Sequence, residues 1–163
     1  MRLVRLLLLL WLSAGFSALA GAADLPVAAD LHADGVRAGR ERLPILVFFA
    51  SHGCPYCYEV EEYYLKPRID SGEYRTKAIV RVVYTDSPRR LQDFNGRNTD
   101  HAAFARHYGV RFTPTIKVVD ADGVELSPSL VGLTTRDFYG FYLDEAINGA
   151  LTKLRSPKLS LLQ

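Results

Sequence analysis

Two short apolar runs in the chain predict buried β-strands. They are residues 43–50 (LPILVFFA) and residues 78–84 (AIVRVVY), both rich in residues that favour β-structure. Continuous runs of this kind are typical of strands covered on both faces, as in the central sheet of an α/β protein. Arg81 interrupts the second run, which indicates a position at a sheet edge or facing solvent.

Helical spacing of apolar residues, together with capping residues, predicts four helices around these strands. Pro67 is expected to end or kink the second helix, and Gly109 supplies a stop for the third. In the fourth, we expect one face to cover the sheet with Phe138, Phe141, Tyr142, Ile147, Leu151 and Leu154. The expected helices are residues 27–40, 55–66, 99–108 and 134–154.

The stretch between the third and fourth helices carries a hairpin signal. Residues 115–120 and 124–126 flank the turn Ala121-Asp122-Gly123, and a further short extended piece is expected at 129–131. Residues 85–98 hold Pro, Gly and several polar side chains, and are expected to form a loop. This order of elements predicts an α/β fold in which helices flank a mixed central sheet on both faces.

Residues 1–22 have the organisation of a secretory signal peptide. Arg2 and Arg5 precede an unbroken apolar run, and small residues suited to cleavage follow it. An uncleaved membrane anchor is the alternative, because residues 6–23 are long enough to cross a thin bilayer. The Gly, Ala and Ser content of their second half favours cleavage, export to the periplasm and a single mature domain at 23–163.

Composition argues against several classes of function. The 163 residues include only two cysteines, too few for a disulfide-stapled scaffold or a four-cysteine zinc site. The chain carries 20 basic and 18 acidic residues, and loss of Arg2 and Arg5 with the signal would balance them. A nucleic-acid-binding protein normally shows a basic excess or stripe, so we expect no nucleic-acid partner. In an oxidising exported compartment the two cysteines can form a disulfide.

The cysteines stand in the motif Cys54-Pro55-Tyr56-Cys57, after the strand 43–50 and at the start of a helix. Cys54 falls at the helix N-cap, where unpaired backbone N–H groups and the helix dipole stabilise a thiolate. Pro55 falls at the first helical position, where its missing N–H costs nothing. One helical turn brings Cys57 beside Cys54 and shields it. We therefore expect Cys54 to attack a substrate disulfide and Cys57 to resolve the mixed disulfide.

Other interpretations of these residues stay open. A purely structural disulfide is poorly motivated, because closing so short a loop adds little stability. His52, if protonated, would stabilise the Cys54 thiolate, whereas a solvated loop histidine would have no role. With Cys54 and Cys57 it would alternatively supply a third ligand for Cu(I) or Zn(II). That set of ligands describes a copper-handling metallochaperone or another non-catalytic binding module.

Residues 43–154 resemble the thioredoxin fold. The resemblance rests on the apolar strand 45–50, the dithiol motif and the sequence Arg111-Phe112-Thr113-Pro114-Thr115. In that family a Thr-Pro pair with a cis peptide bond stands just before a strand and faces the dithiol. The resemblance implies that Pro114 is this cis-proline and that the backbone of Thr113 pairs with a bound substrate segment.

The chain departs from thioredoxin itself around the dithiol. Gly53 stands where thioredoxin usually has a tryptophan, and Phe48 occupies the position of its buried proton-accepting aspartate. Glu61, one turn after Cys57, is a candidate proton acceptor, and a solvated glutamate is the ordinary alternative. Pro55-Tyr56 is typical of glutaredoxins and occurs in some periplasmic isomerases. The glutaredoxin Gly-Gly and the dimerisation domain of the isomerases are not found, so we expect a small monomer.

Five further residues have expected places. Tyr56 is expected to be exposed beside the dithiol, where it would contact a substrate. Tyr63 and Tyr64 are expected to pack in the core or at its rim. His101 and His107 lie on the helix that leads into Gly109 and are expected at the surface.

These observations predict a periplasmic thiol–disulfide oxidoreductase of thioredoxin fold that uses no cofactor. By analogy with thioredoxin, the expected reaction is reduction of disulfides in exported proteins, with a membrane electron donor that keeps the dithiol reduced. Direction depends on the reduction potential, since a difference of about 30 mV changes the equilibrium tenfold.

Overall fold

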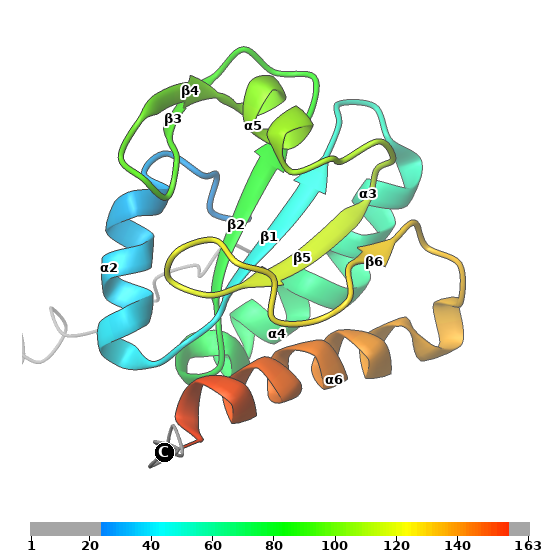
Figure 1. Cartoon of the computed structure of the whole chain (residues 1–163). Coiled ribbons are helices and arrows are strands. Elements are labelled where there is room, and N and C mark those ends of the chain that lie inside the picture. The colour runs from blue at the N-terminus through cyan, green and yellow to red at the C-terminus, as the bar shows by residue number, and fades with distance from the viewer. Residues whose placement is uncertain (1–23, 157–163) are drawn as a thin grey trace, which may run out of the picture.

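The computed structural model describes residues 24–156, and the expected signal peptide lies outside this range. At its centre is a four-stranded sheet of order β2-β1-β5-β6 (Figure 1). Strand β1 (Ile45–Ala50) pairs parallel with β2 (Ile79–Tyr84) and antiparallel with β5 (Thr115–Val119). Strand β5 also pairs antiparallel with β6 (Leu130–Val131). The sheet is therefore mixed, as predicted.

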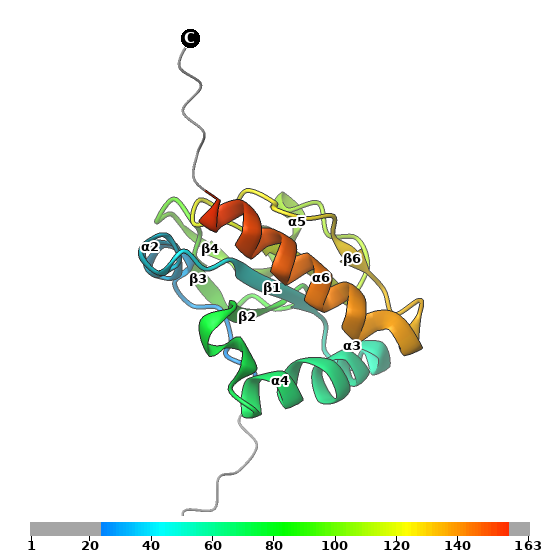
Figure 2. The same ribbon diagram turned by 90° about the horizontal axis from the view of Figure 1, so that it is seen from below.

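Helices cover both faces of this sheet (Figures 1 and 2). Helices α3, α4 and α6 lie on one face, and α2 and α5 lie on the other. Phe49 of β1 stacks on Phe104 of α5, with ring centroids 6.1 Å apart. The predicted α/β class is confirmed. The helices span Leu31–Glu41 (α2), Pro55–Val60 (α3), Lys66–Asp70 (α4), His101–His107 (α5) and Arg136–Arg155 (α6), with a short 3-10 helix at Glu73–Thr76 (η2).

The two inner strands form the centre of the core. Every residue of β1 and β5 is buried. Each of these strands has a neighbouring strand on both sides and helices above and below, and β1 accordingly has an apolar sequence without alternation. Strand β5 also buries the polar residues Thr115 and Lys117. Phe48 in the middle of β1 lies opposite Val82 of β2 and Ile116 of β5.

The first helix begins four residues later than expected. Asp30 caps α2, and its side chain accepts a hydrogen bond of 2.8 Å from the backbone N–H of Ala33. Upstream of this cap the chain runs extended along the outer edge of β2. The N–H of Ala28 donates to the Val82 carbonyl over 2.8 Å, and the N–H of Val82 donates to the Pro26 carbonyl over 2.9 Å. Residues 27 and 28, which the helical pattern had assigned to the helix, therefore belong to this extended segment.

The helix that follows the dithiol continues past Pro67 to Asp70. Helix α3 leads into a π-helical turn, η1 (Glu61–Leu65), in which the N–H of Lys66 donates to the Glu61 carbonyl. Pro67 then lies in the first turn of α4. A proline has no N–H to donate and clashes with a regular preceding turn, so the wider π turn accommodates it. Pro67 was expected to end or kink the helix. The helix does not end there, but its regular α-helical form is interrupted immediately before the proline.

Residues 85–98, expected to form a loop, contribute to a small second sheet. Strand β3 (Arg90–Gln92) pairs antiparallel with β4 (Asn98–Asp100). In the turn between them, the Asp93 carboxylate accepts hydrogen bonds of 2.9 Å from the backbone N–H groups of Asn95 and Arg97. Three-residue strands with so few apolar side chains leave no periodicity to read, so the loop prediction was wrong here.

The predicted Asp-Gly turn forms, but the strand after it is reduced to one bridge. The N–H of Gly123 donates to the Asp120 carbonyl over 3.2 Å, and Gly123 has a positive φ of 84°, which glycine adopts readily. Val119 then forms a single bridge with Glu125. The strand that pairs with β5 is β6, within the extended piece expected at 129–131. It pairs with Thr115 and Ile116, at the opposite end of β5 from the turn.

Of the face predicted to cover the sheet, helix α6 buries Ile147 and Leu151, as expected, but not the aromatic residues. Phe138, Phe141 and Tyr142 are 57%, 60% and 46% exposed, so their predicted burial was wrong. The residues that α6 buries are Tyr139, Leu143, Ile147, Ala150 and Leu151. Aromatic residues on adjacent helical positions offered two apolar stripes, and only packing against the sheet selects one. No helix among residues 24–156, α6 included, is long and apolar enough to cross a lipid bilayer.

Candidate active site

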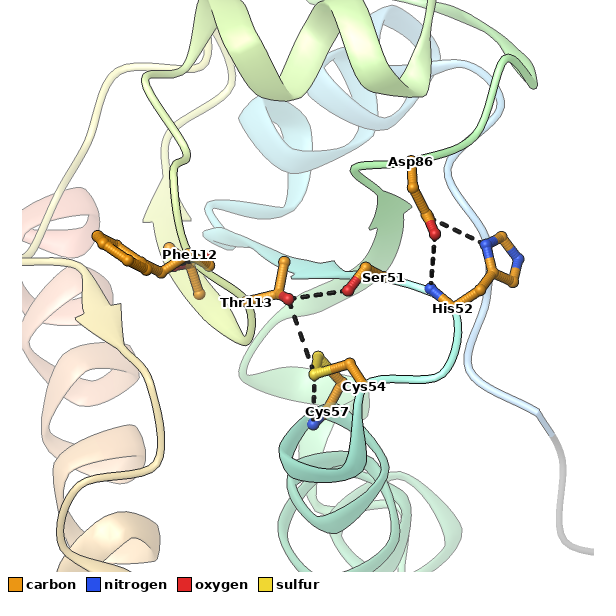
Figure 3. Close-up of a disulfide and its surroundings, with 8 residues drawn as sticks. Ser51, His52, Cys54, Cys57, Asp86, Phe112 and Thr113 are labelled. Carbon is orange, nitrogen blue, oxygen red and sulfur yellow. Dashed lines mark hydrogen bonds and ion pairs between the residues drawn. A yellow bond between two sulfur atoms is a disulfide. The ribbon is translucent and has the colours of Figure 1, made fainter.

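Cys54 and Cys57 form a disulfide at the start of α3 (Figure 3). Their Cα atoms lie 5.2 Å apart. Cys54 is the N-cap in extended backbone, and Pro55 takes the first turn of the helix. Cys57 is only 4% exposed, whereas Cys54 is half-buried. A partner that approaches this end of the helix therefore meets the sulfur of Cys54 first.

The beginning of α3 directs a backbone N–H group at the sulfur of Cys54. The N–H of Cys57 donates to Cys54 Sγ over 3.1 Å. Unpaired N–H groups and the helix dipole favour negative charge at a helix N-terminus. When the disulfide is reduced, a thiolate at Cys54 is stabilised by these groups, which is the physical basis of a reactive cysteine.

The segment before β5 faces the disulfide from the other side (Figure 3). The peptide bond between Thr113 and Pro114 is cis, and Pro114 is buried. Thr113 Oγ1 lies 3.7 Å from Cys54 Sγ and 2.9 Å from Ser51 Oγ. Phe112, the preceding residue, is 69% exposed. The structure thus brings together the end of β1, the start of α3 and the turn before β5.

His52 is held by Asp86 rather than by the cysteines. Its ring Nδ1 lies 3.0 Å from one oxygen of the Asp86 carboxylate, and its backbone N–H donates to the other over 3.0 Å. The ring also stacks on Tyr84 at 4.7 Å and points away from the disulfide (Figure 3). Burial pushes the pKa of Asp86 upward, but the hydrogen bonds from His52 outweigh it and hold that pKa below its usual value. Within residues 24–156, no three His, Cys, Asp or Glu side chains gather to hold a metal ion.

Tyr56 is exposed at 53%, beside the first cysteine of the motif. The guanidinium of Arg136, at the start of α6, lies 5.6 Å from the centre of its ring, which is a cation–π contact. Arg136 also donates to both carboxylate oxygens of Glu59, at 2.5 and 3.1 Å. These contacts attach the surface of α3 to the start of α6 next to the disulfide.

The structure gives Glu61 a partner other than Cys57. Lys66 Nζ lies 3.2 Å from a Glu61 carboxylate oxygen, and Lys66 also pairs with Glu62. The hydrogen bond with Glu62, with a further one from Glu61, raises the pKa of Lys66 despite its desolvation. Phe48, at the position of the thioredoxin aspartate, is fully buried. Glu61 is therefore engaged in an ion-pair cluster on the helix surface.

The prediction for His101 was wrong, because this side chain is completely buried. Its Nδ1 accepts a hydrogen bond of 3.0 Å from the N–H of Tyr84, which leaves Nε2 to donate to the Ala28 carbonyl over 2.9 Å. Burial lowers the pKa of His101 and keeps the ring neutral.

His107 is exposed, as predicted. Tyr63 is 68% exposed rather than packed.

Sequence reasoning missed the partners of the predicted site residues. Neither Ser51 nor Asp86 was singled out from the sequence. Each acts through a contact more than 30 residues away along the chain: Ser51 with Thr113 and Asp86 with His52. A hydroxyl residue immediately after a central strand was the only local signal for Ser51.

Comparisons with known proteins identify the family and the fold of the chain. The family model of the thioredoxin-like domain matches residues 31–146. The structure is similar to a thioredoxin-fold protein from Helicobacter pylori, with a TM-score of 0.53, 21% identity, and coverage of 67% of this chain and 71% of that chain. It is also similar to a mutant of a poplar thioredoxin h, with a TM-score of 0.54, 16% identity, and coverage of 82% and 88%. No curated protein sequence matches the chain.

Proposed function

The chain belongs to the thioredoxin-like domain family, and we propose that it is a thiol–disulfide oxidoreductase that reduces disulfides in exported proteins. The observation that carries this proposal is the unequal placement of the two sulfurs. Cys54 caps the helix and receives the N–H of Cys57, whereas Cys57 itself is buried. This arrangement suits one cysteine to attack and the other to resolve.

The reaction balances as two exchanges. The Cys54 thiolate attacks one sulfur of the substrate disulfide, so that a mixed disulfide forms, the substrate bond breaks and the departing thiolate takes a proton from water. Cys57 then loses its proton and attacks Cys54 Sγ, which releases the second substrate thiolate. Two electrons pass to the substrate, and the Cys54–Cys57 disulfide remains. A dithiol donor must return two electrons before the next turnover.

The proposal also covers the compartment in which the protein acts and the source of its electrons. Residues 1–22 carry the features of a signal peptide, which supports export to the periplasm. An exported reductase needs electrons from across the membrane, so we assign the role of donor to a membrane protein with a dithiol. Trp11 is the only tryptophan of the chain. Mature protein from the periplasmic fraction should therefore show no tryptophan fluorescence, and a persistent signal would mean that the segment is retained.

Reduction of insulin by dithiothreitol tests the activity. The wild type should accelerate precipitation of the insulin chains, and Cys54→Ser should fall to the rate of dithiothreitol alone. Cys57→Ser should accumulate a mixed disulfide with insulin that excess dithiothreitol releases. His107→Gln, a change at an exposed residue of α5, is the matched control and should keep full activity.

Two outcomes would overturn the proposal. One is a wild type that does not accelerate insulin reduction. The other is stoichiometric uptake of Cu(I) without turnover, which would favour the copper carrier instead. The reduction potential of the Cys54–Cys57 pair then decides direction, because a reductase must have a lower potential than its substrate disulfides.

A further inference from the structure

The hydroxyl groups of Ser51 and Thr113 form a pair beside Cys54 that the exchange of disulfides described above does not use. Ser51 Oγ lies 2.9 Å from Thr113 Oγ1, and Thr113 Oγ1 lies 3.7 Å from Cys54 Sγ (Figure 3). Both residues are half-buried. The two side chains and the sulfur therefore form one short chain of polar atoms.

The surrounding backbone holds this chain of atoms in place. The N–H of Cys54 donates to the Ser51 carbonyl over 3.4 Å, and the N–H of Thr85 donates to the Ala50 carbonyl over 2.7 Å. Asp86 binds the backbone N–H of His52 over 3.0 Å. The residues on both sides of Ser51 are thus fixed, and its hydroxyl keeps its position next to Thr113.

Each hydroxyl has a single proton to donate, so the pair has two arrangements. In one, Thr113 donates to Ser51 and the sulfur of Cys54 receives nothing from it. In the other, Ser51 donates to Thr113 Oγ1, and Thr113 is then free to donate to the sulfur. In the second arrangement the Ser51 proton occupies the oxygen of Thr113, and this holds the Thr113 hydroxyl with its own proton directed at Cys54.

The redox state of the dithiol selects between these arrangements. Sulfur in a disulfide is neutral and a weak acceptor. Reduction by a dithiol donor brings two electrons, breaks the S–S bond, and leaves Cys54 as a thiolate and Cys57 with a proton. A charged acceptor makes a hydrogen bond roughly twice as strong as a neutral one. The weak contact from Thr113 to Cys54 in the oxidised protein therefore becomes a stronger hydrogen bond in the reduced protein.

We propose that Ser51 is a positioning residue that orients the Thr113 hydroxyl toward the Cys54 thiolate and so raises the reduction potential of the dithiol. The inference rests on the proposed function, in which Cys54 is the nucleophilic thiolate. A hydrogen bond that is stronger in the reduced state than in the oxidised state favours the dithiol over the disulfide. The pair thus makes the protein a milder reductant, and a more reactive nucleophile near neutral pH, than the same fold without it.

Equilibration of the purified protein with a glutathione redox buffer tests this inference. Thr113→Val removes the hydroxyl at nearly constant shape and should shift the equilibrium about tenfold toward the disulfide, which corresponds to about 30 mV. Ser51→Ala should shift it in the same direction by about threefold, because Thr113 keeps its proton but loses its orientation. Thr113→Ser keeps the hydroxyl and should restore the wild-type value. The rate of alkylation of Cys54 against pH should show the same order, with the half-maximal rate at higher pH in Thr113→Val.

The decisive comparison combines the two substitutions. Because Ser51 acts through Thr113, adding Ser51→Ala to Thr113→Val should change neither the potential nor the alkylation profile further. Equal effects of Ser51→Ala in both backgrounds, or no effect of Thr113→Val, would overturn the inference. Thermal unfolding of the oxidised variants separates a loss of folding from a change in potential. Neither readout needs a protein substrate, so failure to reduce insulin would count against the proposed function alone.

Discussion

The guanidinium of Arg81 donates two hydrogen bonds to the carboxylate of Asp34, at 2.7 and 2.5 Å, and so joins the edge strand β2 to helix α2. The two side chains are 21% and 10% exposed. Arg81 interrupts an apolar strand, and the expectation of an edge position was correct. Its charge is met by Asp34 on the neighbouring helix rather than by water alone.

Removal of one partner of this pair should destabilise the fold. Arg81→Met keeps the apolar stem but leaves the Asp34 carboxylate without its charge partner, and should lower the free energy of unfolding by about 2–4 kcal/mol. Asp34→Leu combined with Arg81→Met should recover most of that loss, because no unpaired charge remains. Urea unfolding measures both. A double variant less stable than the single one would contradict this account.

Substitution of alanine for two helical glycines should change the stability of the fold in opposite directions. A Cβ at Gly35 in α2 would lie 2.3 Å from the backbone oxygen of Ala121, so Gly35→Ala should cost about 1–3 kcal/mol of stability. A Cβ at Gly149 in α6 meets nothing within 4 Å, so Gly149→Ala should add about 0.5–1 kcal/mol through helix propensity. Denaturation midpoints of the two variants check this, and a shared sign would refute the close approach at Gly35.

The buried ring of His101 should make stability fall in mild acid. Its pKa lies below the ordinary value of about 6.5, so below that pH the unfolded chain binds a proton that the folded protein excludes. Stability is therefore full above about pH 6.5 and declines as the pH drops, by at most about 1.4 kcal/mol per pH unit for one proton. Urea unfolding at several pH values measures the slope. His101→Gln should flatten it, and His107→Gln should leave it unchanged. A slope that survives in His101→Gln would assign it to another group.

The two faces of α6 should differ sharply in their tolerance of alanine. Leu143 is fully buried, and Leu143→Ala should cost about 2–5 kcal/mol by removing core contacts. Phe141 is 60% exposed, and Phe141→Ala should stay within about 0.5 kcal/mol of the wild type. Thermal unfolding compares them directly. A large loss for Phe141→Ala would show that the predicted stripe packs after all.

Local patterns in the sequence predicted the parts of the fold that depend on local chemistry. The run 43–50 predicted β1 because a central strand needs apolar side chains on both faces. The motif from Cys54 to Cys57 predicted a helix start because proline and an N-cap have positional preferences of their own.

Long-range pairing decided what the sequence left open. The burial of His101 depends on Tyr84 and Ala28, which lie 17 and 73 residues away. The Ser51–Thr113 contact spans 62 residues, and neither hydroxyl residue is unusual in its own segment. No local periodicity encodes such contacts, because they arise only when the sheet brings distant strand ends together.

The extended residues 26–28 affect whether copies of this protein can associate through the edge of the sheet. An uncovered edge strand exposes unpaired N–H and carbonyl groups. A strand of another molecule can pair with them, and such pairing leads to fibrous association. At Val82 both groups are already taken by the chain's own first described residues. Val82 of β2 is therefore unavailable for pairing with a strand of another copy, whereas the sulfur of Cys54, beyond the end of β1, stays accessible to a partner protein.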